Sequence, residues 1–288
     1  MSAPKRSGPK VVALGGGHGT AVTLQAARRY AGDVTAIVSV ADDGGSSGRL
    51  RQTLGIPAPG DLRRCLVALS DPSAHPLAQA FEHRFDDGHA LGNLVIAGLT
   101  AATGSFIGAL EEAARLLDAQ GTVLPATSDP VVLKAVADRG EVEGQVNVAN
   151  AGRITHVGIV PPDAAPPAQA LEAIAAADQL VLGPGSLFTS VLAVIAVPAI
   201  RQALADARAP LVYLCNLRES AETLGFDVAA HLSTLVAHGL EPDVVLYDPT
   251  HMAKGGCDTR CVEADLAASD GHAHDPGKLA RALADLLG

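Results

Sequence analysis

The stretch that decides the fold runs from residue 10 to residue 40 and reads KVVALGGGHGTAVTLQAARRYAGDVTAIVSV. Lys10–Leu14 is a short apolar run that ends at a cluster of glycines, which predicts a buried strand. Thr20–Tyr30 has near-helical spacing of its apolar residues, and Val34–Val40 is a second apolar, β-branched run. Strand, glycine turn, helix and strand in succession form a βαβ unit, whose crossover requires parallel strands. The sequence therefore predicts an α/β fold with a doubly wound parallel sheet.

The rest of the chain repeats this alternation with one interruption. Between about residues 121 and 160 the apolar pattern becomes short and partly alternating, which predicts a small antiparallel insertion with strands at 131–137, 141–146 and 153–160. Residues 10–288 are expected to form a single domain after a disordered N-terminus at residues 1–9. Other strands are expected at 179–182, 211–214 and 244–246, and other helices at about 61–69, 77–84, 91–103, 105–119, 171–176, from 187 onward, 228–238 and 278–287.

Composition excludes several classes of protein. Of the 288 residues, 48% are hydrophobic and 18% charged, which is typical of a folded chain rather than a disordered one. A net charge of −10, with 3% aromatic residues and no Trp, argues against a nucleic-acid-binding surface. The longest apolar stretch contains Pro198 and falls short of the roughly 18–20 residues that a membrane span needs. We expect a cytoplasmic protein without membrane insertion.

The cysteines offer two interpretations. Four of them are too few for a disulfide scaffold at this length. Cys257 and Cys261 have C-x3-C spacing, with His251, His272 and His274 nearby. A zinc site is one interpretation, but such sites usually have C-x2-C spacing and a second paired motif. Unpaired thiols are favoured, and no metal site is expected here.

The first motif that carries chemistry is Gly15-Gly16-Gly17-His18-Gly19-Thr20, between the first strand and the first helix. Glycines let the backbone approach a ligand closely, and the start of a helix offers free N–H groups that suit a phosphate. The motif is not the dinucleotide fingerprint, because Thr20 stands where that pattern requires Gly, and it is not a Walker loop. Tight packing would also explain the glycines, but their place after the first strand favours phosphate binding.

The second motif is Asp42-Asp43-Gly44-Gly45-Ser46-Ser47-Gly48-Arg49, in an irregular loop predicted after the second strand. An acidic residue there commonly meets a ribose hydroxyl, and two adjacent carboxylates could hold Mg²⁺ through water. Arg49 can bind a phosphate through two hydrogen bonds. A solvated turn is the alternative interpretation. We predict that the ligand contacts Asp42, Asp43, Gly44, Gly45, Ser46, Ser47 and Arg49, and we do not expect Mg²⁺ to be required.

Two other segments add weaker candidates. In Pro59-Gly60-Asp61-Leu62-Arg63-Arg64, Asp61 is placed to cap a helix, and Arg63 one turn later can face an anion. Asn93 lies at the start of an apolar helix and can donate or accept a hydrogen bond, although structural capping explains it equally well. We include Asp61, Arg63 and Asn93 among the predicted ligand contacts.

The last motif repeats the layout of the first. Gly183-Pro184-Gly185-Ser186-Leu187-Phe188-Thr189-Ser190 follows a buried strand and begins a helix. We predict that Gly183, Gly185, Ser186, Thr189 and Ser190 contact the ligand, and that Asn216 does so at the end of another strand. In a parallel sheet all strand C-termini lie along one edge, so these loops are expected to open onto a single crevice.

No catalytic constellation is apparent in the sequence. There is no G-x-S-x-G motif, the cysteines lack a paired catalytic signature, and a lone His18 beside a phosphate loop is not a mechanism. An NAD-dependent oxidoreductase is disfavoured because the dinucleotide fingerprint fails at Thr20. The sequence therefore assigns no catalytic residue.

Six segments resemble the YvcK-type gluconeogenesis factor family. They are VVALGGGHGT, VTAIVSVADDGGSSGRLRQTLGIPAPGDLRRCLVAL, GHALGNLVIAGL, GTVLPAT, ADQLVLGPGSLFTSVL and HDPGKLARAL, and they span about residues 10–284. That family is related to 2-phospho-L-lactate transferase, a CofD-like, nucleotide-dependent enzyme. The resemblance implies a Rossmann-like domain that binds a nucleotide at its glycine loops.

The resemblance also implies a function. Members of the family are linked to UDP-sugar binding, in particular UDP-N-acetylglucosamine, and to cell shape and envelope synthesis during growth on gluconeogenic carbon sources. They are treated as regulators without a demonstrated reaction. We therefore expect a nucleotide-sugar-binding regulator that forms a homo-oligomer, with a dimer as the expected form. The alternative is a Mg²⁺-dependent transferase acting on a nucleoside-diphosphate-linked substrate.

The chain also departs from its relatives at several places. His18 replaces a common Thr, Leu217–Thr223 replaces a common Met-Thr-Gln-Pro-Gly-Glu-Thr segment, and Ala273 stands where a basic residue often precedes His-Asp-Pro. The region from Thr250 to Cys261 is also shortened relative to that family. This shortening and the change at Ala273 fall where a sugar or base is expected to bind. They bear on the identity of the ligand.

Overall fold

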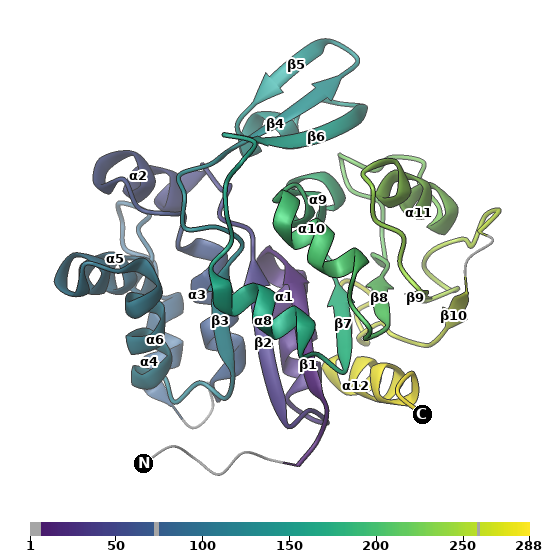
Figure 1. Ribbon diagram of the computed structural model, residues 1–288, viewed down its shortest axis with the longest axis horizontal. Coiled ribbons are helices and arrows are strands. Elements are labelled where there is room, and N and C mark those ends of the chain that lie inside the picture. The colour runs from purple at the N-terminus through teal and green to yellow at the C-terminus, as the bar shows by residue number, and fades with distance from the viewer. Residues whose placement is uncertain (1–6, 72–74, 258–259) are drawn as a thin grey trace.

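A computed structural model describes residues 7–71, 75–257 and 260–288 (Figure 1). In these residues one sheet has seven strands in the order β10-β9-β8-β7-β1-β2-β3, and every neighbouring pair is parallel. The parallel sheet of the predicted α/β fold is thus confirmed. The strands are β1 (Lys10–Gly15), β2 (Asp33–Val38), β3 (Thr122–Pro125), β7 (Gln179–Leu182), β8 (Leu211–Leu214), β9 (Val244–Tyr247) and β10 (Cys261–Glu263).

The order of the strands reverses at β1. Val11 pairs with Val34 of β2 on one side and with Gln179 of β7 on the other, which confirms the predicted βαβ unit. Strands that follow β1 directly lie on one side of it, and strands from the later half of the chain lie on the other. Open α/β sheets bind ligands in the crevice at such a switch point, outside the carboxyl ends of the strands.

Helices cover the sheet in layers. Helix α1 packs beside α3 and α12, and α10 packs on α8 and α9. Figure 1 shows α8 and α10 in front of the strands. The helices are α1 (Gly17–Ala27), α2 (Gly45–Leu54), α3 (Gly60–Leu69), α4 (Pro76–Glu82), α5 (Leu91–Thr103), α6 (Phe106–Leu116), α7 (Gln145–Ala149), α8 (Ala168–Ala175), a π-helix η1 (Leu187–Val191), α9 (Leu192–Ile195), α10 (Pro198–Ala205), α11 (Val228–Ala237) and α12 (Pro276–Asp285).

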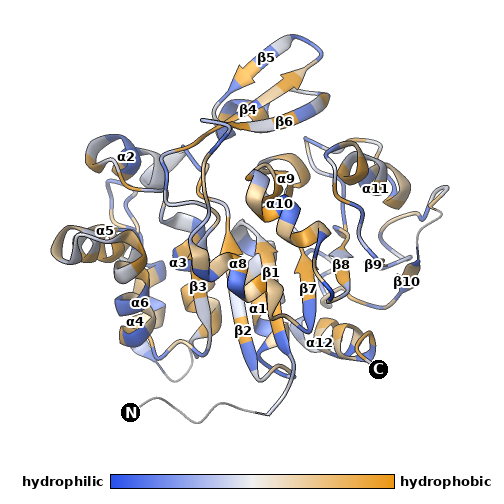
Figure 2. Cartoon of the chain, in the orientation of Figure 1, coloured by the Kyte–Doolittle hydropathy of each residue, from blue (hydrophilic) through white to orange (hydrophobic). Residues whose placement is uncertain are grey.

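The core lies in the central strands and the helices against them. All residues of β7, β8 and β9 are buried, and Figure 2 shows apolar residues along the strands of the main sheet. Continuous apolar strands of this kind are typical of a parallel sheet with both faces covered. In the described part of the chain, no single helix is long and apolar enough to cross a membrane, although the bent pair Leu187–Ile195 and Pro198–Ala205 passes by length and composition.

The antiparallel insertion is smaller than predicted. Strands β4 (Val132–Ala137), β5 (Gly140–Glu143) and β6 (Ile154–Val160) form a separate sheet in the order β5-β4-β6, which Figure 1 shows above the main sheet. Thr122–Pro125 belongs to the main sheet instead, because it pairs in parallel with β2. The strand predicted at 141–146 ends early, since Gly144 takes a positive φ of 92° and α7 begins at Gln145.

Two local predictions were also wrong. The segment from Gly45 onward is helical rather than a loop, because the Gly48 N–H already donates to the Gly44 carbonyl over 2.9 Å. Asp61 is not the N-cap of α3: that position belongs to Pro59, and Asp61 lies in the first turn of the helix. Both errors arise because glycine and proline leave the first residue of a helix poorly defined in sequence.

The cysteine prediction also needs correction. Cys257 and Cys261 form a disulfide, whereas free thiols were expected, because pairing depends on the distance between the two sulfurs in space and sequence spacing alone does not reveal it. Cys65 and Cys215 are free and buried. Of the predicted disordered terminus, residues 1–6 lie outside the described residues, while the Pro9 carbonyl accepts from the Gly32 N–H over 3.0 Å.

Candidate functional site

A cavity of about 410 Å³ opens at the carboxyl ends of β1, β2 and β7. We call it the glycine cavity, because both glycine loops contribute to it. Its position is the switch point of the sheet, where α/β proteins bind ligands. The lining residues are Gly16, Gly17, His18, Gly19, Ser39, Asp42, Asp61, Arg64, Gln145, Gly185, Ser186, Thr189 and Ser190.

The two glycine loops touch each other at Gly19. A Cβ at this position would lie 2.1 Å from the Pro184 carbonyl oxygen, so only glycine fits. Gly17 differs, since a Cβ there would meet nothing within 4 Å although its φ is +68°. A side chain at Gly17 would therefore extend into open space beside the cavity. Gly19 holds the loops together, whereas Gly17 leaves room for a ligand.

Hydrogen bonds fix the loop after β7 from both sides. Thr23 Oγ1 donates to the Gly183 carbonyl over 2.9 Å. Asn216 accepts from the Gly185 N–H over 3.0 Å and donates to the Gly185 carbonyl over 2.9 Å. Asn216 thus uses both ends of its amide on the loop and does not line the cavity. The structure gives Asn216 a role in positioning the loop, and the ligand contact expected from the sequence stays a prediction.

Glu222 positions the hydroxyl-bearing helix start at η1. Its Oε1 accepts from Thr189 Oγ1 over 2.5 Å, and its Oε2 accepts from the N–H groups of Phe188 and Thr189. Glu222 is 7% exposed, so these three hydrogen bonds lie largely out of contact with water. Glu222 lies in Leu217–Thr223, where it matches the Glu of the common Met-Thr-Gln-Pro-Gly-Glu-Thr segment, but its position in the sequence shows no local motif that would give it a role.

Two carboxylates face the glycine cavity from different elements. Asp61 forms an ion pair with Arg64, with Asp61 Oδ1 and Arg64 Nη1 2.6 Å apart, and accepts a hydrogen bond from the Gly17 N–H. Burial raises the pKa of Asp61; the negative charge of Asp42 adds to this rise, and Arg64 opposes it. Asp42 and Asp61 therefore interact electrostatically across the cavity.

The predicted pairing of Asp42 with Asp43 is not seen at the cavity. Asp43 Oδ1 accepts from the Val146 N–H over 3.0 Å and so anchors the insertion. Oxygen ligands suit Mg²⁺, and Asp42 and Asp61 are the two carboxylates among the residues that line the glycine cavity. Within residues 7–71, 75–257 and 260–288, no group of three or more His, Cys, Asp or Glu side chains could hold a metal.

His18 belongs to the first glycine loop and lines the glycine cavity. Burial, followed by the positive charge of Arg64, lowers its pKa below the ordinary value of 6.5. A neutral imidazole can donate or accept a hydrogen bond, according to its tautomer. His18 is therefore suited to a polar contact with a ligand and not to a fixed positive charge at neutral pH.

A family model described as 2-phospho-L-lactate transferase CofD matches residues 11–280. The chain belongs to this family. The gluconeogenesis factor of Halalkalibacterium halodurans is 43% identical, and the match covers 82% of this chain and 77% of that protein. The gluconeogenesis factor of Bacillus subtilis is also 43% identical, with 80% and 75% covered. The sequence resemblance to gluconeogenesis factors is confirmed.

The overall fold is shared with a solved structure of a UPF0052 family member. The crystal structure of a UPF0052 family member from Bacillus halodurans superposes with a TM-score of 0.90 at 35% sequence identity. The match covers 97% of this chain and 99% of that one. Together with the strand order, this similarity confirms the Rossmann-like architecture with its small antiparallel sheet.

In this CofD-family chain some of the predicted site residues line the glycine cavity, some line a second cavity beside it, and some line neither. Those in the glycine cavity are Gly16, Gly17, His18, Gly19, Asp42, Asp61, Gly185, Ser186, Thr189 and Ser190. Others border a second, neighbouring cavity of about 220 Å³, together with Asp42: Gly44, Gly45, Ser46, Ser47, Arg63 and Asn93. Gly15, Thr20, Asp43, Arg49, Gly183 and Asn216 line neither cavity. Thr20, for example, is fully buried and donates to the Gly16 carbonyl over 3.3 Å.

Sequence reasoning missed several lining residues. Ser39 and Gln145 border the glycine cavity, Arg84 borders the second cavity, and Arg64 borders both. Arg64 was visible beside Arg63 in the same motif, and Ser39 precedes the Asp42 loop. Gln145 comes from the insertion, and no local pattern marks it as part of the site.

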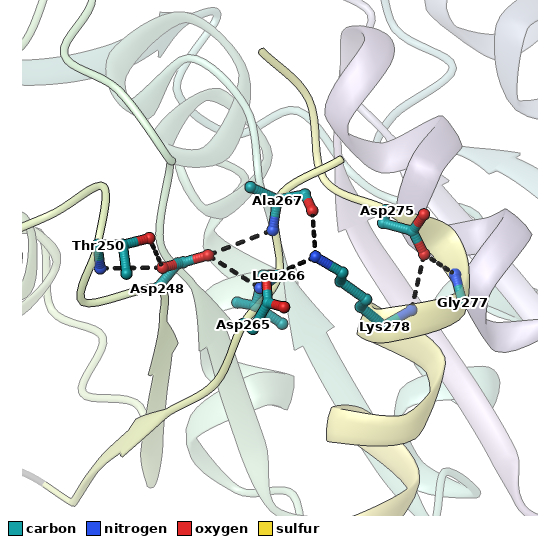
Figure 3. A network of polar contacts seen from close by, with 8 residues as sticks. All are labelled: Asp248, Thr250, Asp265, Leu266, Ala267, Asp275, Gly277 and Lys278. Carbon is teal, nitrogen blue, oxygen red and sulfur yellow. Dashed lines mark hydrogen bonds and ion pairs between the residues drawn. The ribbon is translucent and has the colours of Figure 1, made fainter. Parts of the chain in front are cut away.

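A polar network holds the C-terminal segment (Figure 3). Asp248 Oδ2 accepts from the N–H groups of Leu266 and Ala267 over 2.9 and 3.2 Å. Lys278 Nζ donates to the Ala267 carbonyl over 2.8 Å, and Asp275 caps α12. The Asp275 of the His-Asp-Pro motif thus has a structural role at the start of α12.

Proposed function

We propose that this protein is a nucleotide-sugar-binding regulator that takes a UDP-sugar, of the UDP-N-acetylglucosamine class, in the glycine cavity. The observation that carries the proposal is that loops from β1 and β7 border one cavity at the switch point of a parallel sheet. The backbone of the first loop and the start of α1 would contact the diphosphate. Asp42 at the end of the neighbouring strand would contact the ribose.

The biological part of the proposal follows from the relatives. Several of them carry the name gluconeogenesis factor. For this protein we propose the role that the sequence resemblance implies, which is support of cell shape and envelope synthesis on gluconeogenic carbon sources. A cytoplasmic location and a homodimer belong to this proposal. Light scattering of the purified protein tests the dimer, and growth of a deletion strain on a gluconeogenic carbon source tests the physiological role.

The binding experiment is calorimetry with UDP-N-acetylglucosamine on three proteins. Gly17→Val should abolish binding, because its side chain extends into the ligand space. Gly104→Val is the matched control: Gly104 has a φ of +69°, close to the +68° of Gly17, and a Cβ there also meets nothing within 4 Å. Gly104 ends α5, away from the cavity. Equal affinity of wild type and Gly17→Val would refute the assignment of the ligand to the glycine cavity.

A transferase is the second candidate function. It is favoured by the electrostatic interaction between the Asp42 and Asp61 carboxylates, which together could hold Mg²⁺ beside a diphosphate. When bound, the ion would stabilise charge that develops on the phosphate oxygens. Incubation with UDP-N-acetylglucosamine, Mg²⁺ and a panel of acceptors tests this candidate. Multiple turnovers that disappear in Asp42→Asn would favour a transferase, and tight binding without turnover would favour the regulator.

A further inference from the structure

Helix α5 presents an apolar face to solvent. Its 13 residues, LGNLVIAGLTAAT, contain no charged side chain, although the whole chain has a net charge of −10. Figure 1 shows α5 at the edge of the molecule. Ile96 is buried, whereas Leu94, Gly98, Ala101 and Ala102 are exposed, and we call these four residues the α5 face. An apolar surface without charge is typical of the centre of a protein–protein interface.

Other exposed apolar side chains lie on the elements that pack on α5. Leu54 ends α2, Leu116 ends α6, and Phe85 lies in the loop between α4 and α5. The helices α2, α4 and α6 all contact α5. Together with Leu94, these residues are four of the nine large hydrophobic side chains that are exposed in the described part of the chain. Exposed apolar side chains that gather in one region mark an interaction surface.

Gly98 leaves a gap in the α5 face. It lies in the interior of the helix, where glycine is destabilising relative to alanine. A Cβ at Gly98 would meet no atom of the described residues within 4 Å, so contacts inside the chain do not require glycine there. Gly92 of the same helix differs, because a Cβ there would lie 2.6 Å from the Phe81 ring. The gap at Gly98 therefore leaves room for a second molecule to approach the helix closely.

Leu94 and Gly98 make the α5 face complementary to itself. Residues four apart in a helix are neighbours on one face, so the exposed Leu94 side chain lies beside the gap at Gly98. A two-fold axis that passes midway between these residues would place a second α5 antiparallel to the first. Residue 94 of each helix would then lie opposite residue 98 of the other. In that arrangement each leucine fills the gap left by a glycine, as a self-complementary two-fold interface requires.

Charge also favours a second copy of the chain as the partner. Two copies with a net charge of −10 repel each other, and a two-fold interface places every charged group near its own kind. The α5 helix avoids this repulsion because none of its residues is charged. A lipid surface fits less well, since α5 has no Lys or Arg to attract anionic headgroups.

We propose that the α5 face is the contact between two copies of this chain, with the helices antiparallel and each Leu94 packed over Gly98 of the other copy. A stable interface buries about 800 Å² on each partner, which is more than one helix provides, so we expect Leu54 and Phe85 to extend it. This inference rests on the homodimer of the proposed function and identifies the surface that forms it.

The first test is sedimentation velocity of the full chain and two variants. Leu94→Glu puts a negative charge at the centre of the contact on both copies and should raise the dimer dissociation constant by about tenfold or more. Val236→Glu is the matched control, because Val236 is also an exposed apolar residue of a helix, at 47% exposure against 37% for Leu94. It lies in α11, on the opposite side of the molecule in Figure 1, and should dimerise like the wild type.

Gly98→Gln separates the interface from the fold. Its side chain enters open space in the single chain, and glutamine is a better helix former than glycine, so the urea midpoint of the monomer should not fall. The same side chain occupies the gap that Leu94 of the second copy needs, so dimerisation should weaken by about tenfold. Retained dimerisation in both Gly98→Gln and Leu94→Glu would refute the α5 contact.

A mixing experiment tests whether α5 meets α5. The two-fold axis places residue 94 of both copies one helical turn apart, within reach of long side chains. An equimolar mixture of Leu94→Glu and Leu94→Lys should therefore form a mixed dimer more tightly than either variant dimerises alone. A mixture that stays monomeric would overturn the antiparallel arrangement.

Two outcomes separate this inference from the proposed function. A monomeric wild type would refute both the homodimer and the α5 contact, whereas UDP-N-acetylglucosamine binding is measured independently by calorimetry. A wild-type dimer that neither Leu94→Glu nor Gly98→Gln weakens would refute the α5 contact alone. Cosedimentation of a monomeric wild type with anionic lipid vesicles, lost in Leu94→Glu, would assign the α5 face to a membrane surface and overturn the proposal.

Discussion

Two buried histidines should make this protein sensitive to mild acid. His231 is fully buried and His274 is 7% exposed. Burial lowers the pKa of each ring from 6.5 to about 4. The nearby carboxylates Asp227 and Asp248 oppose the shift without overcoming it. Both rings are therefore neutral in the folded protein at pH 7.

The sign of the effect follows from proton uptake. Below pH 6.5 the unfolded chain binds protons at these histidines while the folded protein does not, so stability falls as the pH decreases towards about 4. At pH 5, a shift from 6.5 to 4 corresponds to about 2 kcal/mol of lost stability for each ring. Carboxylates titrate mainly below this range, so we expect the histidines to dominate between pH 7 and pH 5.

The assay is urea unfolding of the wild type and two variants at pH 7 and pH 5. His231→Phe removes one titrating ring and keeps the aromatic packing against Phe226. It leaves the Tyr213 hydroxyl, 2.8 Å from His231 Nδ1, without its partner, but that cost is the same at both pH values. The loss of stability between pH 7 and pH 5 should shrink by about 2 kcal/mol.

The control is His83→Phe, the same substitution at an exposed position. It should leave the pH dependence unchanged. If His231→Phe loses as much stability between pH 7 and pH 5 as the wild type does, the buried neutral ring of His231 does not cause the pH dependence of stability, and the prediction is wrong.

Three other substitutions test the structure of the site and its surroundings. Gly19→Ala should lower the free energy of unfolding by about 3 kcal/mol, because its Cβ would overlap the Pro184 carbonyl; unchanged urea unfolding would contradict the close approach of the loops. Asp248→Ala leaves two buried N–H groups unpaired and should cost about 2–4 kcal/mol, with faster hydrogen exchange in the segment that it holds; retained protection would argue against the network in Figure 3. Glu222→Ala should weaken UDP-N-acetylglucosamine binding about tenfold in calorimetry, whereas Glu222→Gln, which can still bond Thr189, should retain it. Equal affinity of the two Glu222 variants for UDP-N-acetylglucosamine would contradict a positioning role of the Glu222 carboxylate.

Local chemistry determined the first part of the fold. The apolar runs around Val11 and Val34 and the glycines between them specify a βαβ unit, because strand, turn and helix preferences act over a few residues. The same pattern, an apolar run followed by glycines, predicted the loop after β7. It also placed this loop at the same edge of the parallel sheet as the first glycine loop. The glycine cavity confirms that these two loops meet.

Only the tertiary structure decided which side chains face which cavity. Asp42 and Asp43 are adjacent in sequence, yet Asp42 lines both cavities while Asp43 accepts a hydrogen bond from the Val146 N–H of the insertion. Arg63 and Asn93, predicted as contacts of one crevice, border a separate cavity instead. The direction of a side chain depends on its rotamer and on packing against segments far away in sequence, and no local pattern encodes either. The sequence therefore determines which loops form the site, and long-range packing decides how their residues are divided within it.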